Sequence, residues 1–337
     1  MKHTLESIAK LAGVSRGTVS RIVNGESGVK QASRERVLRI IEETGYYPNS
    51  QARSLAGGRT NNIGVVFFGN QSNMLTHHLF YEVLQGIQSS SAANDYDLLL
   101  FANRSENDRE YWKRIGDKGK VDGLIIMGER IEETYLSYYR SKQIPYVLIG
   151  KRIFEELPLI CVTSDYRAGA YEAAMHLINR GRRTIAYLQG IQGAYHESER
   201  LAGYREALEA AGIGFDRRLL LEGNADEAQA FKAMEGLLQS GISVDGVFAG
   251  NDLMAFGAMD ALRRHGRDIP GDVSVVGFDD VQAAAYHKPA LTTVRQDKLR
   301  LGKEAISLLL EAMNGSLGLE QSKDVIIECD FVVRESS

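Results

Sequence analysis

The chain has 337 residues, of which 44% are hydrophobic and 25% charged. This composition is typical of a folded globular protein with about two domains, and it excludes disordered and fibrous proteins. No uncharged apolar run approaches the ~20 residues of a membrane helix, and the N-terminal segment has no apolar signal core. Cys161 and Cys329 provide neither a disulfide framework nor a zinc-knuckle spacing. We therefore expect a reduced, cytoplasmic protein with no membrane partner and no metal.

The charge is unevenly distributed along the chain. The net charge is −4, but residues 1–60 contain ten Lys or Arg against five Glu and no Asp, a net charge of +5. The remaining residues carry a net −9. A basic segment on an acidic body indicates a polyanion-binding module, although a short helical head can also be arginine-rich by chance. The motifs have to decide between these two interpretations.

Helical periodicity predicts a small helical head. Thr4 is expected to cap a first helix, which is followed by a turn in which Gly13 takes a positive φ. Ser15 is expected to cap a second helix that extends to Asn24. Three short helices with a glycine turn between the first two describe a helix-turn-helix, and an all-α head is the predicted fold of this segment.

The third helix of the head is expected from Ser33 to Thr44, with Gly45 as its C-terminal stop and Tyr46 to Pro48 closing the bundle. The residues expected to face inward from the three helices are Leu5, Ile8, Ala9, Leu11, Val19, Ile22, Val23, Val37, Leu38, Ile40 and Ile41.

The second helix of the head is the candidate DNA-reading element. Its N-terminal half presents short or cationic side chains on the outer face, which is where a recognition helix meets base edges. The alternative is a solvated helix face with incidental arginines. The candidate DNA-binding residues of this segment are Ser15, Arg16, Gly17, Ser20, Arg21 and Asn24.

From Asn61 onward, short apolar runs alternate with amphipathic helical stretches. Such spacing is typical of parallel strands joined by crossover helices. The strands are too numerous to fit easily in one sheet. The predicted fold class is therefore an α/β body of two doubly wound parallel-sheet lobes. The expected buried strands are Ile63–Phe68, Asp97–Phe101, Gly123–Met127, Tyr146–Ile149, Thr184–Gln189, Leu219–Glu222, Asp245–Ala249 and Val273–Phe278.

Several motifs, in order along essentially the whole chain, resemble the lactose repressor/galactose repressor (LacI/GalR) family of bacterial transcription regulators. They are IAKLAGVSRGTVSRIVNG, GRRTIAYLQG, ERLAGYREAL, GVFAGNDLMAFGAMDAL, IPGDVSVVGFDD and PALTTVRQD. The resemblance implies a body of periplasmic-binding-protein type and a homodimeric repressor that reads a palindromic DNA operator and responds to a small, sugar-like effector. It also implies a DNA-binding domain over residues 1–48, a hinge over 49–60, and an effector-binding and dimerisation domain over 61–337.

The segment that joins head and body is long enough for about two helical turns, which is too short to be stable alone in water. The resemblance implies that it folds as a hinge helix on DNA, where Leu55 wedges between base pairs in the minor groove and Ala52 lets paired helices approach closely. Asn49 is a further DNA-binding candidate. The alternative is a plain interdomain linker with a stray leucine.

A ligand of two doubly wound lobes is expected in the cleft between them, at the carboxyl ends of the strands. By resemblance, Arg200, Asn251 and Asp279 take the effector positions, and a guanidinium fork with amide and carboxylate groups suits the vicinal hydroxyls of a sugar. Helix capping is the alternative role for Asp279 and for Asn251, and Asp252 is expected to cap a helix.

His77, Phe80 and His196 complete the candidate effector residues. The histidines in THHLF depart from the Asn-Pro-Phe-Phe common in the family, and they are interpreted as cleft-lining or solvent-exposed rather than as zinc ligands. Gly150 stands where many sugar-responsive relatives have Asp, and a stacking aromatic is absent around Asn224. These departures leave the identity of the effector open.

The chain has no phosphate-binding loop, no nucleophile elbow and no dinucleotide fingerprint after its first body strand. We therefore expect no enzyme and no cofactor. The alternatives are a solute-binding protein, which the basic head opposes, and a sugar- or nucleotide-processing enzyme on a similar body. No leucine heptads follow the last apolar run, so a dimer is expected.

Overall fold

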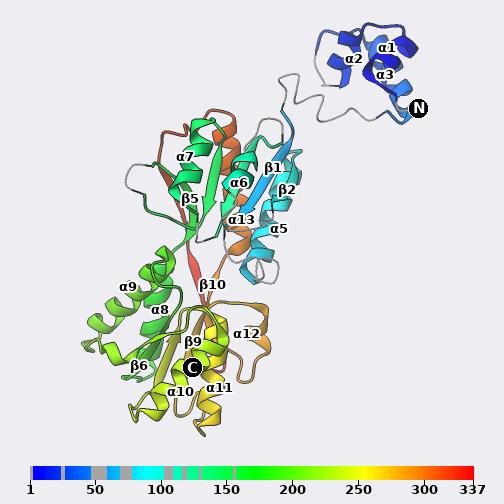
Figure 1. Cartoon of the computed structure of the whole chain (residues 1–337). Coiled ribbons are helices and arrows are strands. Elements are labelled where there is room, and N and C mark those ends of the chain that lie inside the picture. The colour runs from blue at the N-terminus through cyan, green and yellow to red at the C-terminus, as the bar shows by residue number, and fades with distance from the viewer. Residues whose placement is uncertain are drawn as a thin grey trace. The chain divides into compact units, whose positions relative to one another are not determined.

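The structure is a computed structural model, and it describes residues 3–23, 27–46, 59–68, 78–101, 109–115, 120–128, 131–154 and 157–337. By its internal contacts the chain divides into one unit of residues 1–62 with 117–122 and a second unit of the remaining residues. Figure 1 shows the helical head and the α/β body. Within the described residues, no helix combines the length and apolar character needed to cross a bilayer.

The head contains the three predicted helices, α1 (Leu5–Ala12), α2 (Arg16–Val23) and α3 (Gln31–Thr44). Thr4 caps α1 through a capping box with Ser7, and Thr18 donates its amide to the Ser15 hydroxyl at 3.1 Å. Gly13 and Gly45 end their helices with φ of 62° and 59°, as predicted. The buried core of the head is Ile8, Ala9, Ala12, Val19, Ile22, Val37 and Tyr46.

Two residues predicted to face inward in the head are exposed. Leu11 is 56% exposed and Leu38 is 48% exposed. Ile8, Ala9 and Ala12 form the buried stripe of α1, and at 100° per residue Leu11 lies outside this stripe. Val37 is the buried residue of α3, and Leu38 is turned one position away from it. These helices pack against neighbours on one side. The buried arc of each helix is therefore narrower than the arc that its apolar residues span, and Leu11 and Leu38 lie outside it.

The body contains two six-stranded sheets, each of which organises one lobe. The N-terminal lobe has the order β11-β5-β4-β3-β1-β2, and the C-terminal lobe has the order β12-β10-β9-β8-β6-β7. The strands are β1 (Asn62–Phe67), β2 (Asp97–Phe101), β3 (Gly123–Met127), β4 (Tyr146–Ile149), β5 (Ile160–Ser164), β6 (Ile185–Gln189), β7 (Leu220–Glu222), β8 (Gly246–Ala249), β9 (Ser274–Asp279), β10 (Thr292–Gln296), β11 (Lys323–Ile327) and β12 (Cys329–Val332).

The two sheets repeat one connectivity, because within each lobe the strands lie in the order 6-5-4-3-1-2. This confirms the two doubly wound lobes. The last strand breaks the repeat, since β11 runs parallel to β5 whereas β12 runs antiparallel to β10. The prediction of buried strands was wrong for the two predicted strands at the ends of the sheets, β2, in which Leu99 and Leu100 are exposed, and β7, in which no residue is buried.

Helices cover both faces of each sheet (Figure 1). In the C-terminal lobe, alternate residues of one strand enter different cores: Leu188 packs under α10 and α11, and Tyr187 packs under α8 and α9. The body helices are α5 (His78–Ala93), α6 (Arg109–Ile115), α7 (Glu133–Ser141), α8 (Tyr166–Asn179), α9 (Tyr195–Ala210), α10 (Glu227–Gln239), α11 (Asp252–Arg264), α12 (Gln282–Tyr286) and α13 (Lys298–Met313), with a 3₁₀ turn at Arg217–Leu219.

The three large helix pairs of the body each depend on a glycine at the contact. A Cβ at Gly302 of α13 would lie 2.3 Å from the Val83 carbonyl oxygen of α5, and one at Gly203 of α9 would lie 2.2 Å from the Arg167 carbonyl oxygen. Gly257 of α11 meets α10 in the same way. These backbones therefore approach more closely than any side chain permits.

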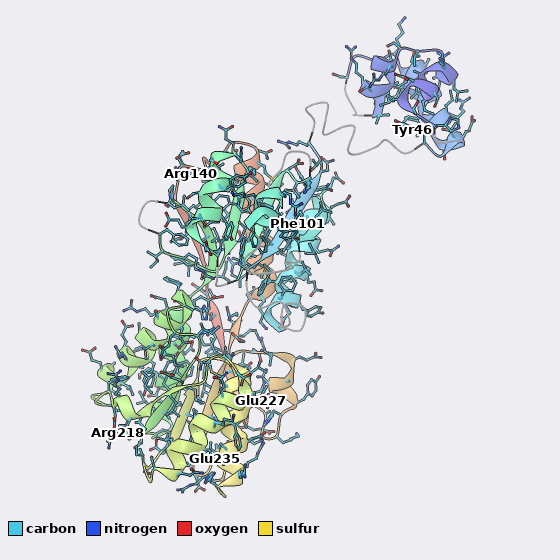
Figure 2. All side chains as sticks on the ribbon, in the orientation of Figure 1. Tyr46, Phe101, Arg140, Arg218, Glu227 and Glu235 are labelled. Carbon is cyan, nitrogen blue, oxygen red and sulfur yellow. The ribbon has the colours of Figure 1, made fainter. Side chains whose placement is uncertain are left out.

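Charged side chains lie on the outer surface of the lobes, where Figure 2 labels Arg140 and Arg218. Arg140 pairs with Glu320, and Arg218 pairs with Asp216. Exposed pairs of this kind contribute little to stability, so the lobes depend on their buried faces.

We predict that Gly302→Ala lowers the free energy of unfolding by about 1–3 kcal/mol, because the added methyl must displace the α5 backbone. Gly236→Ala on α10 is the matched control. Apart from the neighbouring backbone of α10 itself, no described atom lies within 4 Å of the position that the new methyl group would take. This control should stabilise the protein by about 0.5–1 kcal/mol. Urea denaturation measures both changes, and equal effects of the two substitutions would contradict the prediction.

Candidate functional site

The second helix of the head presents the predicted residues to solvent. Ser15, Arg16, Gly17 and Arg21 are exposed, and Ser20 is half-buried. The Arg16 guanidinium lies 3.8 Å from Glu6, and both side chains remain more than two-thirds exposed. Ser15 has a structural role in addition, because it caps α2. Asn24 lies outside the described residues, as do Asn49, Ala52 and Leu55 of the predicted hinge.

The residues directly before β1 are hydrogen-bonded to the residue directly before β3. The Asp122 carboxylate accepts hydrogen bonds from the amide and hydroxyl of Thr60, at 2.8 and 2.9 Å, and from the amide of Asn61 at 2.9 Å. Three donors on one carboxylate hold the residues that precede β1 in one place.

Arg200 is the centre of the candidate ligand site. It projects from α9 and is 5% exposed, with its guanidinium carbon 4.1 Å from the ring centroid of Phe278 and 5.0 Å from that of Tyr166. Its Nη2 lies 3.4 Å from Oδ1 of Asp279. Burial opposes the charged form of Arg200, but the carboxylates of Asp279 and Glu197 outweigh it and raise the pKa. Arg200 is therefore held as a buried cation beside two neighbouring aromatic rings.

Asp279 is held in an unusual backbone conformation at the end of β9. Its φ is 112°, and the next residue, Asp280, has a φ of 50°. Gln296 donates from Nε2 to Asp279 at 2.6 Å, and it accepts the Ser164 hydroxyl at 2.7 Å. A chain of polar contacts thus runs from Ser164 to Arg200. Consecutive non-glycine residues in this region store strain, which is common at ligand sites.

The structure corrects the expectation that Asp252 caps α11, because Asn251 takes that position. Asn251 is the N-cap of α11 and accepts the Met254 amide at 2.8 Å, whereas Asp252 is the first residue inside the helix. Asp252 is fully buried and accepts the Val281 amide at 2.8 Å and the Thr293 hydroxyl at 2.5 Å. Burial and the nearby carboxylate of Asp279 raise the pKa of Asp252 well above its ordinary value.

Capping is not the role of Asp279. The helix that follows it, α12, has Val281 as its N-cap residue and no side-chain cap. The structure therefore brings Arg200 and Asp279 into contact, and it places Asn251 at the carboxyl end of β8 in the same lobe. In this sheet the strand order reverses between β6 and β8, which is where open α/β sheets bind ligands.

The remaining predicted effector residues have other surroundings. The His196 ring lies 5.7 Å from the Tyr166 ring and is half-buried, one turn before Arg200 on α9. Phe80 is 3% exposed in the core of the N-terminal lobe, with its ring edge-to-face against Phe67 at 5.7 Å. His77 lies outside the described residues. Among the described residues, no group of three His, Cys, Asp or Glu could hold a metal.

Sequence reasoning missed several residues of this cluster. Gln296 stands within the PALTTVRQD motif but received no role, although it follows an alternating run at a strand end. Ser164 ends a strand that was not predicted, and Tyr166 follows it. Glu197 is fully buried and accepts a hydrogen bond from the Tyr187 hydroxyl, and burial raises the pKa of Glu197. No local sequence signal distinguishes it from the half-buried Glu199.

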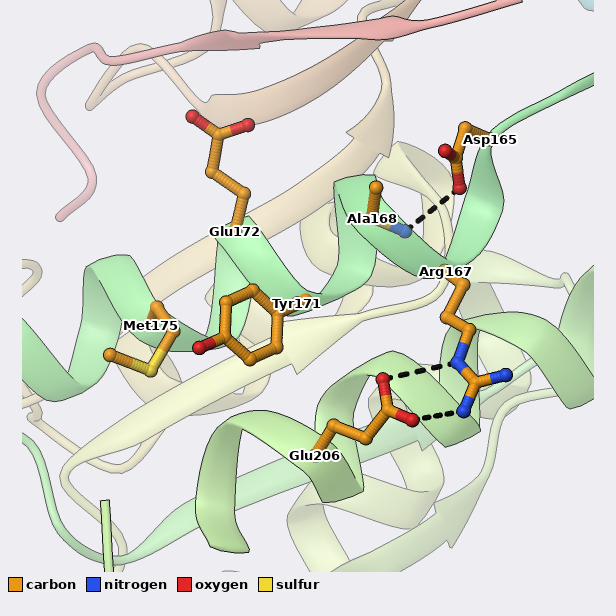
Figure 3. A pocket seen from close by; sticks show the side chains of 7 residues that line it. All are labelled: Asp165, Arg167, Ala168, Tyr171, Glu172, Met175 and Glu206. Atoms are coloured by element: carbon orange, nitrogen blue, oxygen red, sulfur yellow. Dashed lines mark hydrogen bonds and ion pairs between the residues drawn. The ribbon is translucent and has the colours of Figure 1, made fainter. Parts of the chain in front are cut away.

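A separate hollow of about 600 Å³ lies on the outer surface of α8 and α9 (Figure 3). In it Arg167 pairs with Glu206, and Asp165 caps α8 by accepting the Ala168 amide at 3.0 Å. Tyr171, Glu172 and Met175 complete its lining. None of the predicted effector residues contributes to this hollow, so it is distinct from the cluster around Arg200.

A helix-turn-helix head with an exposed cationic second helix, joined to a two-lobed body with a polar cluster at its strand ends, defines a DNA-binding transcription regulator with a ligand sensor. Comparison with known proteins agrees. Residues 4–49 match the model of bacterial regulatory proteins of the lacI family, and residues 174–337 match that of the periplasmic binding protein-like domain. The chain belongs to the LacI family of ligand-controlled transcription regulators.

Relatives and solved structures align over nearly the whole chain. The transcriptional regulator CelR of Thermobifida fusca is 34% identical over 99% of this chain and 98% of its own. Catabolite control protein A of Priestia megaterium is 32% identical over 93% of each chain. The lac repressor dimer bound to operator and an anti-inducer has a TM-score of 0.85 and 27% identity, covering 100% of this chain and 99% of that one. A CelR–cellobiose complex has a TM-score of 0.75 and 33% identity, covering 99% and 100%.

We predict that Arg200→Ala lowers the free energy of unfolding by about 3–5 kcal/mol, because it leaves the Asp279 carboxylate buried without its cation. Arg167→Ala is the control, since the Arg167–Glu206 pair is also an arginine–carboxylate pair made by α9 but is exposed. The control should change stability little. Thermal and urea unfolding measure both variants, and a destabilisation of similar size in the two would contradict a buried ion pair at Arg200.

Proposed function

We propose that the protein is a cytoplasmic repressor without catalytic activity that binds a palindromic operator as a homodimer. A sugar-like effector that binds between the two lobes either weakens or strengthens its affinity for the operator. The proposed division is a DNA-binding domain over residues 1–48, a hinge over 49–60 and an effector-binding and dimerisation domain over 61–337. The relatives are transcription regulators, and none of the catalytic motifs sought in the sequence is present.

One observation carries the ligand proposal. The Nε of Arg200 is buried with no hydrogen-bond partner among the described residues, while Nη2 faces Asp279. An unsatisfied buried donor costs about 1–3 kcal/mol, which a ligand oxygen would offset. Because Asp279 already balances the charge of Arg200, the cluster favours a neutral ligand with several hydroxyls over an anion. The relative CelR, solved as a complex with cellobiose, supports a saccharide.

In the head, the proposed DNA contacts are Ser15, Arg16, Gly17, Ser20, Arg21 and Asn24, with Asn49, Ala52 and Leu55 in the hinge. The exposure of Ser15, Arg16 and Arg21 supports their part of the first set, because a base contact needs a side chain that is free to leave its own helix surface. The hinge set stands on the family resemblance. In the body, the proposed effector residues are His77, Phe80, His196, Arg200, Asn251 and Asp279.

The effector proposal predicts stabilisation by a saccharide. At 100 times the dissociation constant a ligand selective for the folded state adds about 2.7 kcal/mol, which raises the melting temperature. Thermal-shift measurements should compare cellobiose, other neutral sugars, sugar phosphates and a purine. Asn251→Asp keeps the oxygen that caps α11 but removes the amide donors, so it should weaken sugar binding about tenfold. A shift with purine and none with any sugar would overturn the ligand class.

The DNA proposal predicts that Arg16→Ala relaxes the preference at one base pair per half-site and costs about 1–3 kcal/mol there. The measurement is affinity for an operator selected from random palindromic duplexes and for its single-base variants, at one salt concentration. Arg39→Ala on the exposed face of α3 is the control and should leave the base preference unchanged. If Arg16→Ala weakens binding equally on every duplex, Arg16 contacts a phosphate and not a base.

The hinge proposal predicts that Leu55→Ala weakens specific operator binding and reduces DNA bending, because an apolar wedge unstacks the central base step. Effector affinity of the free protein and the salt slope of non-specific binding should stay unchanged, since neither uses the wedge. Bend angles from fluorescence transfer between the operator ends test this prediction. An operator that wild type and variant bind equally well without bending would leave the segment as a plain linker.

A further inference from the structure

Lys298 is a buried lysine that the proposed function does not use. It is the first residue of α13, and its side chain is 1% exposed. Its ammonium group donates to Oε1 of Glu82 on α5 at 2.8 Å and to the main-chain carbonyl of Asp280 at 3.3 Å. An ammonium without water keeps its charge only where acceptors surround it, so these two contacts determine where Lys298 lies.

The two acceptors belong to different lobes. Glu82 lies on α5, which packs against α13 on the sheet of the N-terminal lobe. Asp280 directly follows β9 of the C-terminal lobe and is the neighbour of Asp279, the partner of Arg200. One side chain thus connects the backbone beside the candidate ligand site with a helix of the other lobe.

The turn that Lys298 holds has several other restraints. The Asp280 carboxylate accepts Arg295 at 2.6 Å and Arg334 at 2.6 Å, both within the C-terminal lobe. The Val281 amide is held by Asp252. The carbonyl that Lys298 contacts belongs to the same peptide as this Val281 amide, so that peptide is held on both sides. Asp279 and Asp280 both have positive φ, which leaves the turn few alternative backbone conformations. We therefore expect a change in the partners of the Asp279 side chain to displace this carbonyl.

We propose that Lys298 is a positioning residue that ties the Asp279–Asp280 turn to Glu82 of α5, so that a rearrangement at the ligand site is transmitted to the N-terminal lobe. This inference rests on the proposed ligand site, but the link itself requires no ligand to be present. It predicts coupling in both directions, since energetic coupling between two sites is reciprocal.

Hydrogen–deuterium exchange of the full chain without ligand tests the link. Glu82→Gln, made in the N-terminal lobe, should speed exchange of the amides of Asp280 and Val281 roughly threefold or more, because loss of the charge-assisted contact frees the ammonium group. In a Lys298→Met background the same substitution should add nothing at these amides. In the reverse direction, Asp279→Asn should change exchange in residues 82–87 of α5 only when Lys298 is present.

The matched control is Glu311→Gln, which breaks a lysine pair of similar length, Lys323 to Glu311 at 2.9 Å, within the N-terminal lobe. It should leave the Asp280 and Val281 amides unchanged. Lys298→Gln replaces Lys298→Met if the latter does not fold, and Gln296→Met is a second perturbation of Asp279. The proposal is overturned if Glu82→Gln leaves the turn at the wild-type rate, or if its effect persists without Lys298. A wrong effector class would alter the thermal-shift results and none of these exchange rates.

Discussion

Both lobes depend on three places where the chain crosses from one sheet to the other. The crossings follow β5, β10 and β11, and each leaves the carboxyl end of its strand. They are joined laterally, because the Ser164 hydroxyl donates to Gln296 and the Asp165 amide donates to the Ile327 carbonyl at 2.8 Å. Polar side chains of residues at these strand ends therefore lie close together beside the crossings. The location of the Arg200–Asp279 pair follows from this connectivity, and the chemistry of the pair follows from local sequence.

The fold was largely predictable, because central parallel strands are buried on both faces and therefore appear as short continuous apolar runs. All eight predicted strands exist within one residue at each end. The strands that were missed lack this signal. β5 and β10 mix Thr, Ser and Gln with apolar residues, and β11 and β12 are edge strands in which most residues are partly or fully exposed. The partners of Ser164, Thr292 and Thr293 come from segments distant in sequence, which a local pattern does not encode.

The candidate site was predictable in part. Arg200 and Asp279 followed from the family resemblance, and the structure brings them together. That Asn251 and not Asp252 caps α11 could not be foreseen, because either side chain can cap a helix and the choice depends on donors in the later segment 281–293. Lys298 was beyond prediction for a similar reason. Its partner Glu82 is 216 positions away in sequence, and only the packing of α13 on α5 places them together.

The three crossings also affect how the protein is made. The N-terminal lobe takes β11 from residues 323–327 and the C-terminal lobe takes β12 from residues 329–332, so neither sheet has its full set of strands until the ribosome has synthesised almost the whole chain. Domains usually fold one after another as they emerge, at about 5–20 residues per second. Here both lobes must wait with an unpaired strand edge, at β5 and at β10. Exposed edges recruit foreign strands, which gives chaperones a defined period in which to act on this nascent chain.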